Sequence, residues 1–261
     1  MAALKPVTLI TGASAGIGAA LAYEFASHGH ELVLAARRTA QLEELAGAIA
    51  ALGRARPHVI AADLTRSDAA AHVADELNAR GLEPNFVVNN AGFGLLGSAA
   101  ELDRAEQLAM IDLNARALTD LSLRFIESLA RHRGGILNVA SVAGFMPGPG
   151  LAVYYATKAY VLSFSEALHH ELKPRGVRVT ALCPGPVATG FQTRAGMPVG
   201  YFPSMLDRSV ERVAREGYDG LMAGRRVVIP GFANRVAAFL PRLAPRGMVL
   251  AVMGRFRKAP P

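Results

Sequence analysis

The stretch Thr11-Gly12-Ala13-Ser14-Ala15-Gly16-Ile17-Gly18 decides the fold that this sequence predicts. It directly follows an apolar run at residues 7–10, which is typical of a buried strand, and it opens a helical pattern. Its glycines permit a tight turn and a close backbone approach to a pyrophosphate, and the helix start offers free N–H groups. A glycine cluster alone is also compatible with a structural turn, but its place after a first strand indicates a dinucleotide-binding loop. The candidate contacts are Gly12, Ser14, Gly16, Ile17 and Gly18.

Further along the chain, short apolar runs alternate with helical patterns. The predicted strands are residues 7–10, 32–35, 59–61, 86–88, 136–139, 177–182 and 227–229, the last ended by Pro230. Runs that are apolar throughout are typical of strands covered on both faces. The segments between them are long enough for crossover helices, as at residues 41–45, where Leu42 and Leu45 share one face. We therefore predict an α/β fold: a Rossmann-like, doubly wound parallel seven-stranded sheet flanked by helices, with a C-terminal helical extension.

Composition supports a globular enzyme-like chain. Of the 261 residues, 51% are hydrophobic and 19% charged, which excludes a disordered protein. We expect residues 1–230 to form one dinucleotide-binding catalytic domain with a substrate loop at 186–222, and residues 231–261 to extend it. The single cysteine, Cys183, cannot form an internal disulfide and fits a reducing compartment. With neither a signal peptide nor a spanning apolar run in the sequence, we expect a cytoplasmic protein, and we predict no metal site.

The positive charge is concentrated near the C-terminus. The formal net charge is +7, yet the stretch from residue 220 to 261 holds no acidic residue. Its basic residues are Arg225, Arg226, Arg235, Arg242, Arg246, Arg255, Arg257 and Lys258. The rest of the chain is therefore almost neutral, and no nucleic-acid-reading motif accompanies the charge. We expect no nucleic-acid partner.

The end of the second strand, Ala35-Ala36-Arg37-Arg38, predicts which cofactor is preferred. In sites that bind NAD, an acidic residue about 20 positions past the glycines holds the ribose 2′-hydroxyl. Ala36 occupies that place here, and Arg37 or Arg38 can instead pair with a 2′-phosphate, with Ser14 donating a further hydrogen bond. The alternative is a solvated arginine pair at a helix start. We predict NADP(H).

Two segments at later strand ends are candidates for the same site. Asp63-Leu64-Thr65 follows the third strand, and Asp63 either caps the next helix or, with Leu64, contacts the adenine; both readings stay open. Asn89-Asn90-Ala91-Gly92 ends the fourth strand. The small side chains there let a cofactor lie across the strand tips, which makes Asn90, Ala91 and Gly92 candidate contacts.

Ser141, Tyr154 and Lys158 are the candidate catalytic residues. Tyr154 and Lys158 stand one helical turn apart and so share a face. A cation about 4 Å away can lower a tyrosine pKa by up to about 3 units, although burial offsets part of this. Tyr154 is then a general acid or base near neutral pH. Tyr155 is a rival, but no basic residue follows it by four positions, and such a pair alone is common on helix surfaces.

In this combination and order the motifs resemble the short-chain dehydrogenase/reductase family, from about residue 7 to 189. The spacing between Ser141 and Tyr154 matches that family and supports Tyr154 over Tyr155. The resemblance also implies a fourth catalytic role for Asn114, through its backbone and a water relay; without it, Asn114 is an ordinary polar residue of a helix. It further implies that the segment after the sixth strand contacts the nicotinamide, through Pro184, Gly185, Val187 and Thr189.

The resemblance implies a mechanism. Ser141 polarises a substrate carbonyl, a hydride passes from the nicotinamide, and Tyr154 protonates the oxygen. Lys158 holds the nicotinamide ribose and depresses the tyrosine pKa, and the Asn114 relay resupplies the proton. The expected substrate is an apolar small-molecule carbonyl or alcohol, and we expect a homodimer or homotetramer. The rival reading is a non-catalytic NADP(H)-binding scaffold or sensor.

The C-terminal part departs from the Asp-Gly-Gly-like ending common in that family. One apolar helix face is predicted from Phe232, Val236, Phe239, Leu240 and Leu243, and a second apolar cluster comprises Met248, Val249, Leu250, Val252 and Met253. These helices either pack over the substrate cleft or at a dimer interface, or they make a weak peripheral membrane contact. Met197, Tyr201, Phe202 and Met205 in the preceding loop suggest an apolar substrate, although core packing explains them equally well.

Overall fold

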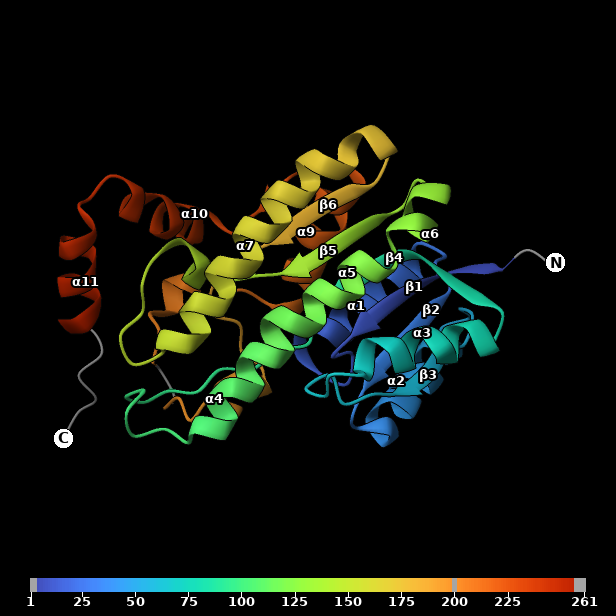
Figure 1. Cartoon of the computed structure of the whole chain (residues 1–261), viewed down its shortest axis with the longest axis horizontal. Coiled ribbons are helices and arrows are strands. Elements are labelled where there is room, and N and C mark those ends of the chain that lie inside the picture. Colours follow the sequence, from blue (N-terminus) through green and yellow to red (C-terminus); the bar gives the residue numbers. More distant parts are fainter. Residues whose placement is uncertain (1–3, 199–200, 256–261) are drawn as a thin grey trace.

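A parallel seven-stranded sheet forms the centre of the computed structural model, which describes residues 4–198 and 201–255 (Figure 1). The strand order is β3-β2-β1-β4-β5-β6-β7. The strands are β1 (Lys5–Thr11), β2 (Leu32–Ala36), β3 (His58–Ala61), β4 (Leu82–Asn89), β5 (Gly135–Val139), β6 (Arg178–Leu182) and β7 (Val227–Val228). All seven predicted strands are confirmed. β4 starts four residues earlier than predicted, and Ile229 lies outside β7, which pairs only with β6.

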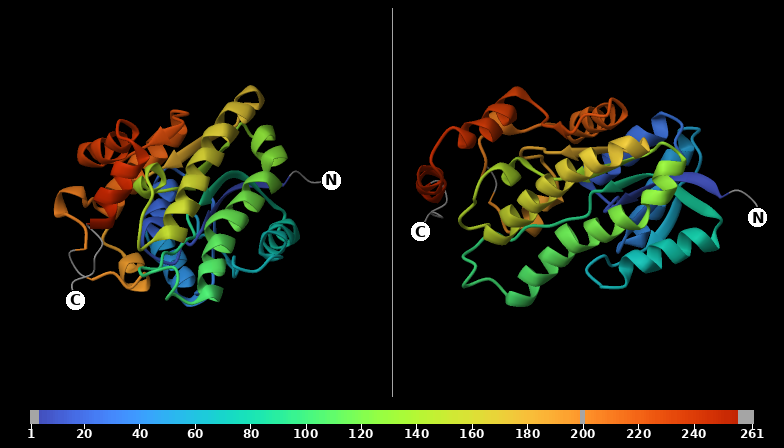
Figure 2. Two further views of the ribbon diagram at one scale, coloured as in Figure 1. Left: turned by 60° about the vertical axis from the view of Figure 1, so that its left-hand side comes forward. Right: turned by 45° about the horizontal axis from the view of Figure 1, so that its top comes forward.

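Helices cover both faces of this sheet (Figure 2). They are α1 (Gly16–Ser27), α2 (Thr39–Ala51), α3 (Ala69–Ala79), α4 (Arg104–Ile111), α5 (Leu118–Arg124), α6 (Ile126–Arg131), α7 (Ala152–Leu172), α8 (Gly190–Arg194), α9 (Val210–Met222), α10 (Phe232–Phe239) and α11 (Arg246–Arg255). One core lies between the sheet and α1, α2 and α9, and includes Phe25, Leu42 and Val213. A second core lies under α3, α5 and α7, and includes Val73, Leu121 and Leu168. The predicted doubly wound α/β fold is therefore confirmed.

The chain reverses its winding direction between β1 and β4. After β1 it builds β2 and β3 on one side, and then returns to place β4 directly beside β1, with Ile10 opposite Val88. The loops after β1 and β4 therefore diverge on opposite sides and leave a crevice at the carboxyl ends of the strands. In open parallel sheets, ligands bind at this switch point. The glycine loop and Asn90-Ala91-Gly92 both lie there.

The C-terminal extension forms α10 and α11, at the end of the molecule opposite the N-terminus (Figure 1). Of the apolar residues singled out in the sequence, Phe232, Phe239 and Leu243 are exposed. The large cavity described below is lined by Leu240, Met248, Val249, Val252 and Met253. None of the described helices has the length and apolar character needed to span a bilayer.

Candidate active site

A cavity of about 1370 Å³ occupies the crevice at the carboxyl ends of the strands. One half is lined by sequence-predicted residues: Gly12, Ser14, Gly16, Ile17, Arg37, Arg38, Asp63, Leu64, Asn90, Ala91, Gly92, Ser141, Tyr154, Lys158, Pro184, Gly185, Val187 and Thr189. The structure thus brings together segments that lie far apart in the chain. Two predicted residues, Gly18 and Asn114, are not part of the wall; each lies behind it and supports it.

The glycine loop leaves no room for larger side chains. Gly12 has a φ of +63°, and a Cβ atom on it would lie 2.7 Å from the Cα of Ala91. A Cβ on Gly18 would collide with the Asn90 side-chain amide and with the backbone of Gly12. That amide donates to the carbonyl oxygens of Thr11 and Gly12, at 3.0 Å each. Asn90 therefore holds the loop in shape, a role that the sequence analysis did not foresee.

The predicted 2′-phosphate residues lie side by side at the rim of this half. Arg38 Nη2 donates to Ser14 Oγ over 2.9 Å, which links the end of β2 to the glycine loop. Arg37 and Arg38 are both exposed, and both line the cavity beside Ala36. The arrangement offers cations and a hydroxyl, and Ala36 contributes no carboxylate.

Asp63 does not cap the next helix. Its Oδ1 accepts hydrogen bonds from the backbone N–H and the hydroxyl of Thr65, at 3.1 and 2.8 Å. The helix α3 begins only at Ala69, with Asp68 at its N-cap. The capping interpretation was therefore wrong, because a tight turn intervenes between β3 and α3. Asp63 shapes that turn at the cavity wall.

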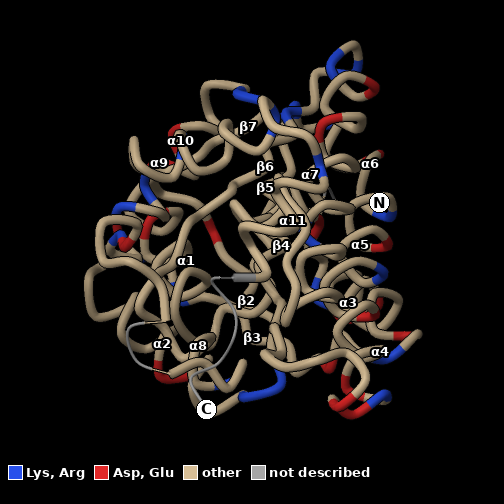
Figure 3. Tube along the Cα trace, turned by 90° about the vertical axis from the view of Figure 1, so that its left-hand side faces the viewer, with Lys and Arg blue, Asp and Glu red and all other residues tan. Residues whose placement is uncertain are grey.

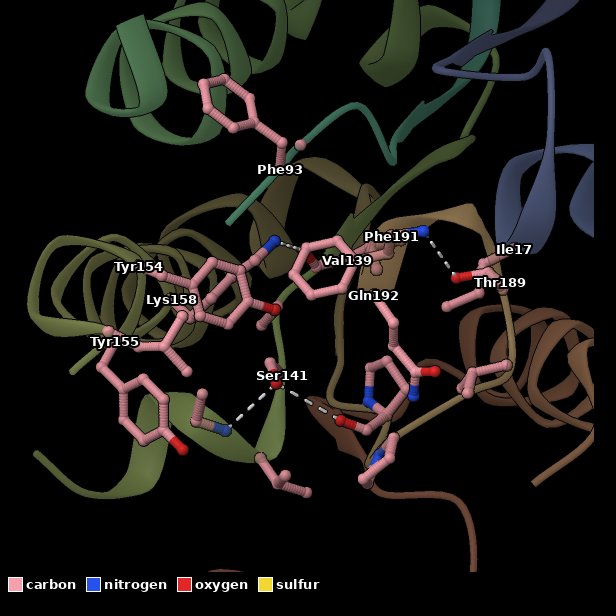
Figure 4. Close-up of a pocket in the computed structure, with 18 of the residues that line it drawn as sticks. Ile17, Phe93, Val139, Ser141, Tyr154, Tyr155, Lys158, Thr189, Phe191 and Gln192 are labelled. Atoms are coloured by element: carbon pink, nitrogen blue, oxygen red, sulfur yellow. Dashed lines mark hydrogen bonds between the residues drawn. The ribbon is translucent and has the colours of Figure 1, made fainter. Parts of the chain in front are cut away.

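Ser141 and Tyr154 meet at the centre of the cavity, where Figure 4 shows the Tyr154 hydroxyl directed toward Ser141 and Tyr155 extending to the other side. Ser141 is positioned by its backbone and hydroxyl: Oγ accepts from the Ala143 N–H at 3.1 Å and donates to the Pro184 carbonyl at 3.5 Å. Tyr155 is more deeply buried and packs among Ala143, Leu151 and Met197. The hydroxyl of Tyr154, and not that of Tyr155, therefore lies on the side of Ser141.

The expected depression of the Tyr154 pKa is wrong for this structure. Burial raises the pKa of Tyr154 well above its ordinary value, the hydrogen bond with Ser141 acts in the opposite direction, and Tyr155 adds a small increase. The ammonium of Lys158 does not offset this rise in the pKa of Tyr154. Its Nζ lies 5.8 Å from the centroid of the Tyr154 ring and donates to the Val139 carbonyl at 2.7 Å. Burial also lowers the pKa of Lys158 to about 8. Tyr154 is therefore a neutral phenol at pH 7.

Asn114 lies in a π-helical turn, Asp112–Ala117, between α4 and α5. Its side chain is 1% exposed: Oδ1 accepts from the Phe93 N–H at 3.1 Å, and Nδ2 donates to the Phe93 carbonyl at 2.9 Å and to Thr157 Oγ1 at 3.1 Å. π-turns are rare and are found frequently at functional sites. A Cβ on Gly92 would lie 3.0 Å from Asn114 Oδ1 and 3.6 Å from Lys158 Nζ, so Gly92 separates the two. The side chain of Asn114 is thus an anchor and not an ordinary helix-surface group.

The segment after β6 wraps around the opposite wall. Thr189 caps α8 by accepting from the Phe191 N–H at 3.3 Å, and its methyl carbon lies 3.1 Å from a Cβ built on Gly16. Phe191 packs against Tyr154 with 5.3 Å between ring centroids. Gly185 lies against Asn234 of α10, whose fully buried amide donates to the carbonyls of Leu206 and Pro230. The sequence analysis missed both Phe191 and Asn234.

The second half of the cavity is apolar. Its lining comprises Met146, Leu151, Tyr155, Phe191, Met197, Tyr201, Phe202, Leu206, Ala237, Leu240, Pro241, Ala244, Met248, Val249, Val252 and Met253. Met197, Tyr201 and Phe202 line the cavity and also pack in one apolar cluster, so both readings of the sequence fit them, whereas Met205 is 69% exposed and lies outside the wall. At the rim, Arg194 of α8 pairs with Glu106 of α4 at 2.9 Å and stacks over Phe93. This pair bridges the two sides of the opening.

A network of buried amides fixes the strands beneath the site. Asn89 Nδ2 donates to Ser122 Oγ and to Asn138 Oδ1, at 2.9 Å each, and Asn138 Nδ2 donates to Ser165 Oγ at 2.9 Å. The network joins β4, β5, α5 and α7, the elements that carry or flank Asn90, Ser141 and Tyr154. Among the described residues Asn89 Oδ1 has no hydrogen-bond partner, so the network is held through the N–H groups of the two side-chain amides.

Comparisons with known proteins agree with this geometry. The model of the short chain dehydrogenase family matches residues 6–198. Sulfoacetaldehyde reductase 2 of Chromohalobacter salexigens is 38% identical over 191 residues, covering 72% of this chain and 75% of that protein. A short-chain dehydrogenase from Sphingobium yanoikuyae, solved in complex with NADPH, is 34% identical, with a TM-score of 0.80 and 98% of each chain covered. The bulky-bulky ketone specific alcohol dehydrogenase from Comamonas testosteroni is 30% identical, with a TM-score of 0.76, covering 99% of this chain and 96% of that one.

The family match spans the glycine loop, the Asn90 segment, Ser141, Tyr154 and Lys158, all of which the fold gathers around one cavity. From the match and from this geometry it follows that the chain belongs to the short-chain dehydrogenase/reductase family of oxidoreductases.

Proposed function

We propose that this chain transfers a hydride between NADP(H) and the carbonyl or secondary alcohol carbon of an apolar small molecule. The observation that carries the proposal is that Tyr154 and Ser141 line one cavity together with the glycine loop and with the apolar side chains described above. A cofactor and a substrate that occupy the two halves meet at these hydroxyls. In this proposal, the residues at the boundary perform the chemistry, and each half selects one reactant.

The cofactor half fits an NADP(H) dinucleotide. The glycine loop would hold the pyrophosphate, because it leads into α1 at Gly16 and the N-terminus of a helix offers free N–H groups to an anion. Arg37, Arg38 and Ser14 would hold the 2′-phosphate. Asp63 and Leu64 would contact the adenine, and Lys158 the nicotinamide ribose. The bound NADPH of the Sphingobium yanoikuyae relative supports this preference. When bound, the cofactor supplies or accepts the hydride.

The residues of this chain would handle the proton. The Ser141 hydroxyl donates to the substrate carbonyl oxygen and polarises it. The Tyr154 phenol, neutral at pH 7 because burial raises its pKa, donates its proton to the same oxygen as negative charge develops there. Because the phenol already carries its proton at pH 7, it can act as the acid in carbonyl reduction without first taking up a proton. Asn114 would act through its backbone and water in returning a proton to the site. Val187, Pro184, Gly185 and Thr189 would position the nicotinamide end.

The substrate half suits a bulky apolar ketone. Aliphatic and aromatic side chains form most of its wall, and the charged pair Arg194–Glu106 lies at the rim. The specificity for bulky ketones named for the Comamonas testosteroni relative supports this choice. We also propose a cytoplasmic homodimer or homotetramer, in line with the family resemblance.

A panel of ketones, aldehydes and alcohols assayed with NADPH or NADP⁺ tests the proposal. We expect turnover with bulky apolar ketones that exceeds turnover with small polar aldehydes. The rival scaffold or sensor predicts NADPH binding, seen by fluorescence, with no turnover of any member of the panel. That result would refute the enzymatic proposal.

A further inference from the structure

The C-terminal extension presents an unusually apolar surface to solvent. We call this surface the apolar end face; its residues are Phe232, Val236, Phe239, Leu240, Leu243, Met248, Leu250 and Val252. Phe232 is 78% exposed and Leu243 70%. All eight come from α10, α11 and the turn between them, which lie together at one end of the molecule (Figures 1 and 2). Exposed apolar surface gathered in this way marks an interaction site, whereas single exposed apolar residues do not.

Unpaired cations accompany the apolar end face, and Figure 3 looks onto this end of the molecule. Arg242 and Arg246 are exposed, and the guanidinium carbon of Arg242 lies 5.3 Å from the centroid of the Phe145 ring. In this region the ion pairs of the described residues involve Arg226 and Arg235, and neither Arg242 nor Arg246 takes part in one. The sequence from residue 220 to 261 has eight basic residues and no acidic one; two of the eight, Arg257 and Lys258, lie outside the described residues.

Apolar side chains flanked by unpaired arginines complement a surface that is both anionic and apolar. The headgroup region of a bilayer that contains anionic lipids is such a surface. A second copy of this chain fits less well. In a two-fold interface each partner presents the same patch, so the unpaired arginines of both copies would gather in one interface without an acidic partner from this segment.

The apolar end face also adjoins the substrate half of the cavity. Leu240, Met248 and Val252 are exposed on their outer side and line the cavity as well. We propose that the apolar end face docks on the surface of an anionic lipid bilayer and that an apolar substrate enters the cavity from the lipid. The second part rests on the proposed function; the first does not.

Vesicle co-sedimentation of the full chain tests the docking. We expect binding to vesicles of phosphatidylcholine mixed with phosphatidylglycerol, and much weaker binding to phosphatidylcholine alone. The variant Arg242→Gln/Arg246→Gln should weaken binding to the mixed vesicles about fivefold per arginine. Its matched control, Arg54→Gln/Arg104→Gln, removes two exposed arginines elsewhere and should bind like the wild type. Equal loss in both variants would mean that only total charge matters, and would overturn the proposal.

A second pair of variants tests the apolar contribution. Phe232→Ser/Phe239→Ser/Leu243→Ser changes only exposed side chains outside the cavity wall and should abolish most vesicle binding. Leu52→Ser, at a residue that is 67% exposed at the end of α2, is the control and should leave binding unchanged. Absence of wild-type binding to the mixed vesicles would refute docking. So would a wild-type dimer in solution that the triple variant converts to a monomer, because the face would then serve a second copy.

Turnover separates this inference from the proposed function. With NADPH and a water-soluble ketone, the triple variant should be as active as the wild type. With a hydrophobic ketone dissolved in the mixed vesicles, it should be much slower. Equal rates of the two proteins on the vesicle-dissolved ketone would refute entry from the lipid. A wild type that binds vesicles but reduces neither ketone would refute the proposed function and leave docking standing.

Discussion

Arg38 Nη2 donates a hydrogen bond to the Ser14 hydroxyl over 2.9 Å, and so ties the end of β2 to the glycine loop at the rim of the cavity. The contact brings together two groups that sequence reasoning assigned separately to a 2′-phosphate. Because Arg38 is exposed and its partner is a neutral hydroxyl, its charge stays available to an anion.

Cofactor preference is the direct test of this arrangement. We expect NADPH to exceed NADH in kcat/KM by at least about tenfold, since a charge-assisted hydrogen bond contributes about 1.5–3 kcal/mol. Arg37→Ala should erase most of that preference, and Arg38→Ala should reduce it, each by weakening NADPH alone. Steady-state kinetics with both cofactors measure this. The exposed Arg54, changed to Ala, is the control and should leave the preference intact.

The preference should also be reversible. In Ala36→Asp/Arg37→Ala, the new carboxylate repels a 2′-phosphate and accepts from a 2′-hydroxyl, so NADH should become the better cofactor. Equal efficiency of both cofactors in the wild type would show that the phosphate site is misplaced, as would a preference untouched by either arginine substitution.

The two adjacent tyrosines should differ sharply in importance. Tyr154→Phe removes the hydroxyl beside Ser141 and should lower kcat by about 10²–10⁴-fold, with NADPH binding changed by only a few fold. Tyr155→Phe alters a ring packed among Ala143, Leu151 and Met197 and should be much milder. Turnover and cofactor titration of both variants decide this. Equal losses, or a larger loss for Tyr155→Phe, would contradict the assignment.

Lys158 should lower the stability of the fold at neutral pH. Its pKa falls from 10.5 to about 8 because the ammonium is buried. The unfolded chain therefore binds the proton more tightly, and the free energy of unfolding should rise as pH increases from about 8 to about 10.5. Lys158→Met should raise the free energy of unfolding at pH 7 by up to about 3 kcal/mol while abolishing most turnover.

The difference in free energy of unfolding between Lys158→Met and the wild type should shrink as pH rises and vanish above about pH 10.5. Denaturant unfolding of the wild type and Lys158→Met across this range measures it. The conservative Lys158→Arg keeps a charge that does not titrate in this window and should show no such pH-dependent recovery. A wild type more stable than Lys158→Met at pH 7 would contradict the prediction.

Removing α11 should affect the substrate more than the cofactor. A chain ending at Ala244 loses Met248, Val249, Val252 and Met253 from the apolar wall but keeps Asn234 and the glycine loop. Because a buried apolar side chain contributes about 1.5–3 kcal/mol, KM for a bulky ketone should rise at least about tenfold. The dissociation constant of NADPH, measured by fluorescence, should stay within about twofold. Loss of both affinities together would indicate general unfolding instead.

The strands and the glycine loop could be predicted because their physical cause lies in local sequence. A parallel strand covered on both faces must be apolar throughout, and Leu32–Ala36 is buried at every position. Ser141, Tyr154 and Lys158 do line one cavity. Helical spacing in the sequence indicated the shared face of Tyr154 and Lys158, whereas the link between Ser141 and Tyr154 came from the family resemblance.

Other features depend on tertiary surroundings that no local pattern reveals. The sequence predicted a lowered Tyr154 pKa because it shows the neighbouring lysine, but neither the depth of burial of the phenol nor the bond that turns the Lys158 ammonium to the Val139 carbonyl. Asp63 was a candidate helix cap because the sequence does not show that a turn separates it from α3, whose N-cap is Asp68. The sequence left open whether the apolar residues of α10 and α11 pack over the cavity or face outward, since apolar spacing alone does not say which side meets the cavity.

Different segments of the chain supply different parts of the cavity wall, and this origin has an evolutionary consequence. The family match ends at residue 198, while α10 and α11 add a further part of the apolar wall. Under the proposed function, selectivity for new compounds can therefore diverge by changes in residues 199–261 while Ser141, Tyr154 and Lys158 stay unchanged. A chimera built on the same logic must respect one contact across the junction: any donated tail needs a side chain that fits against Gly185 as Asn234 does.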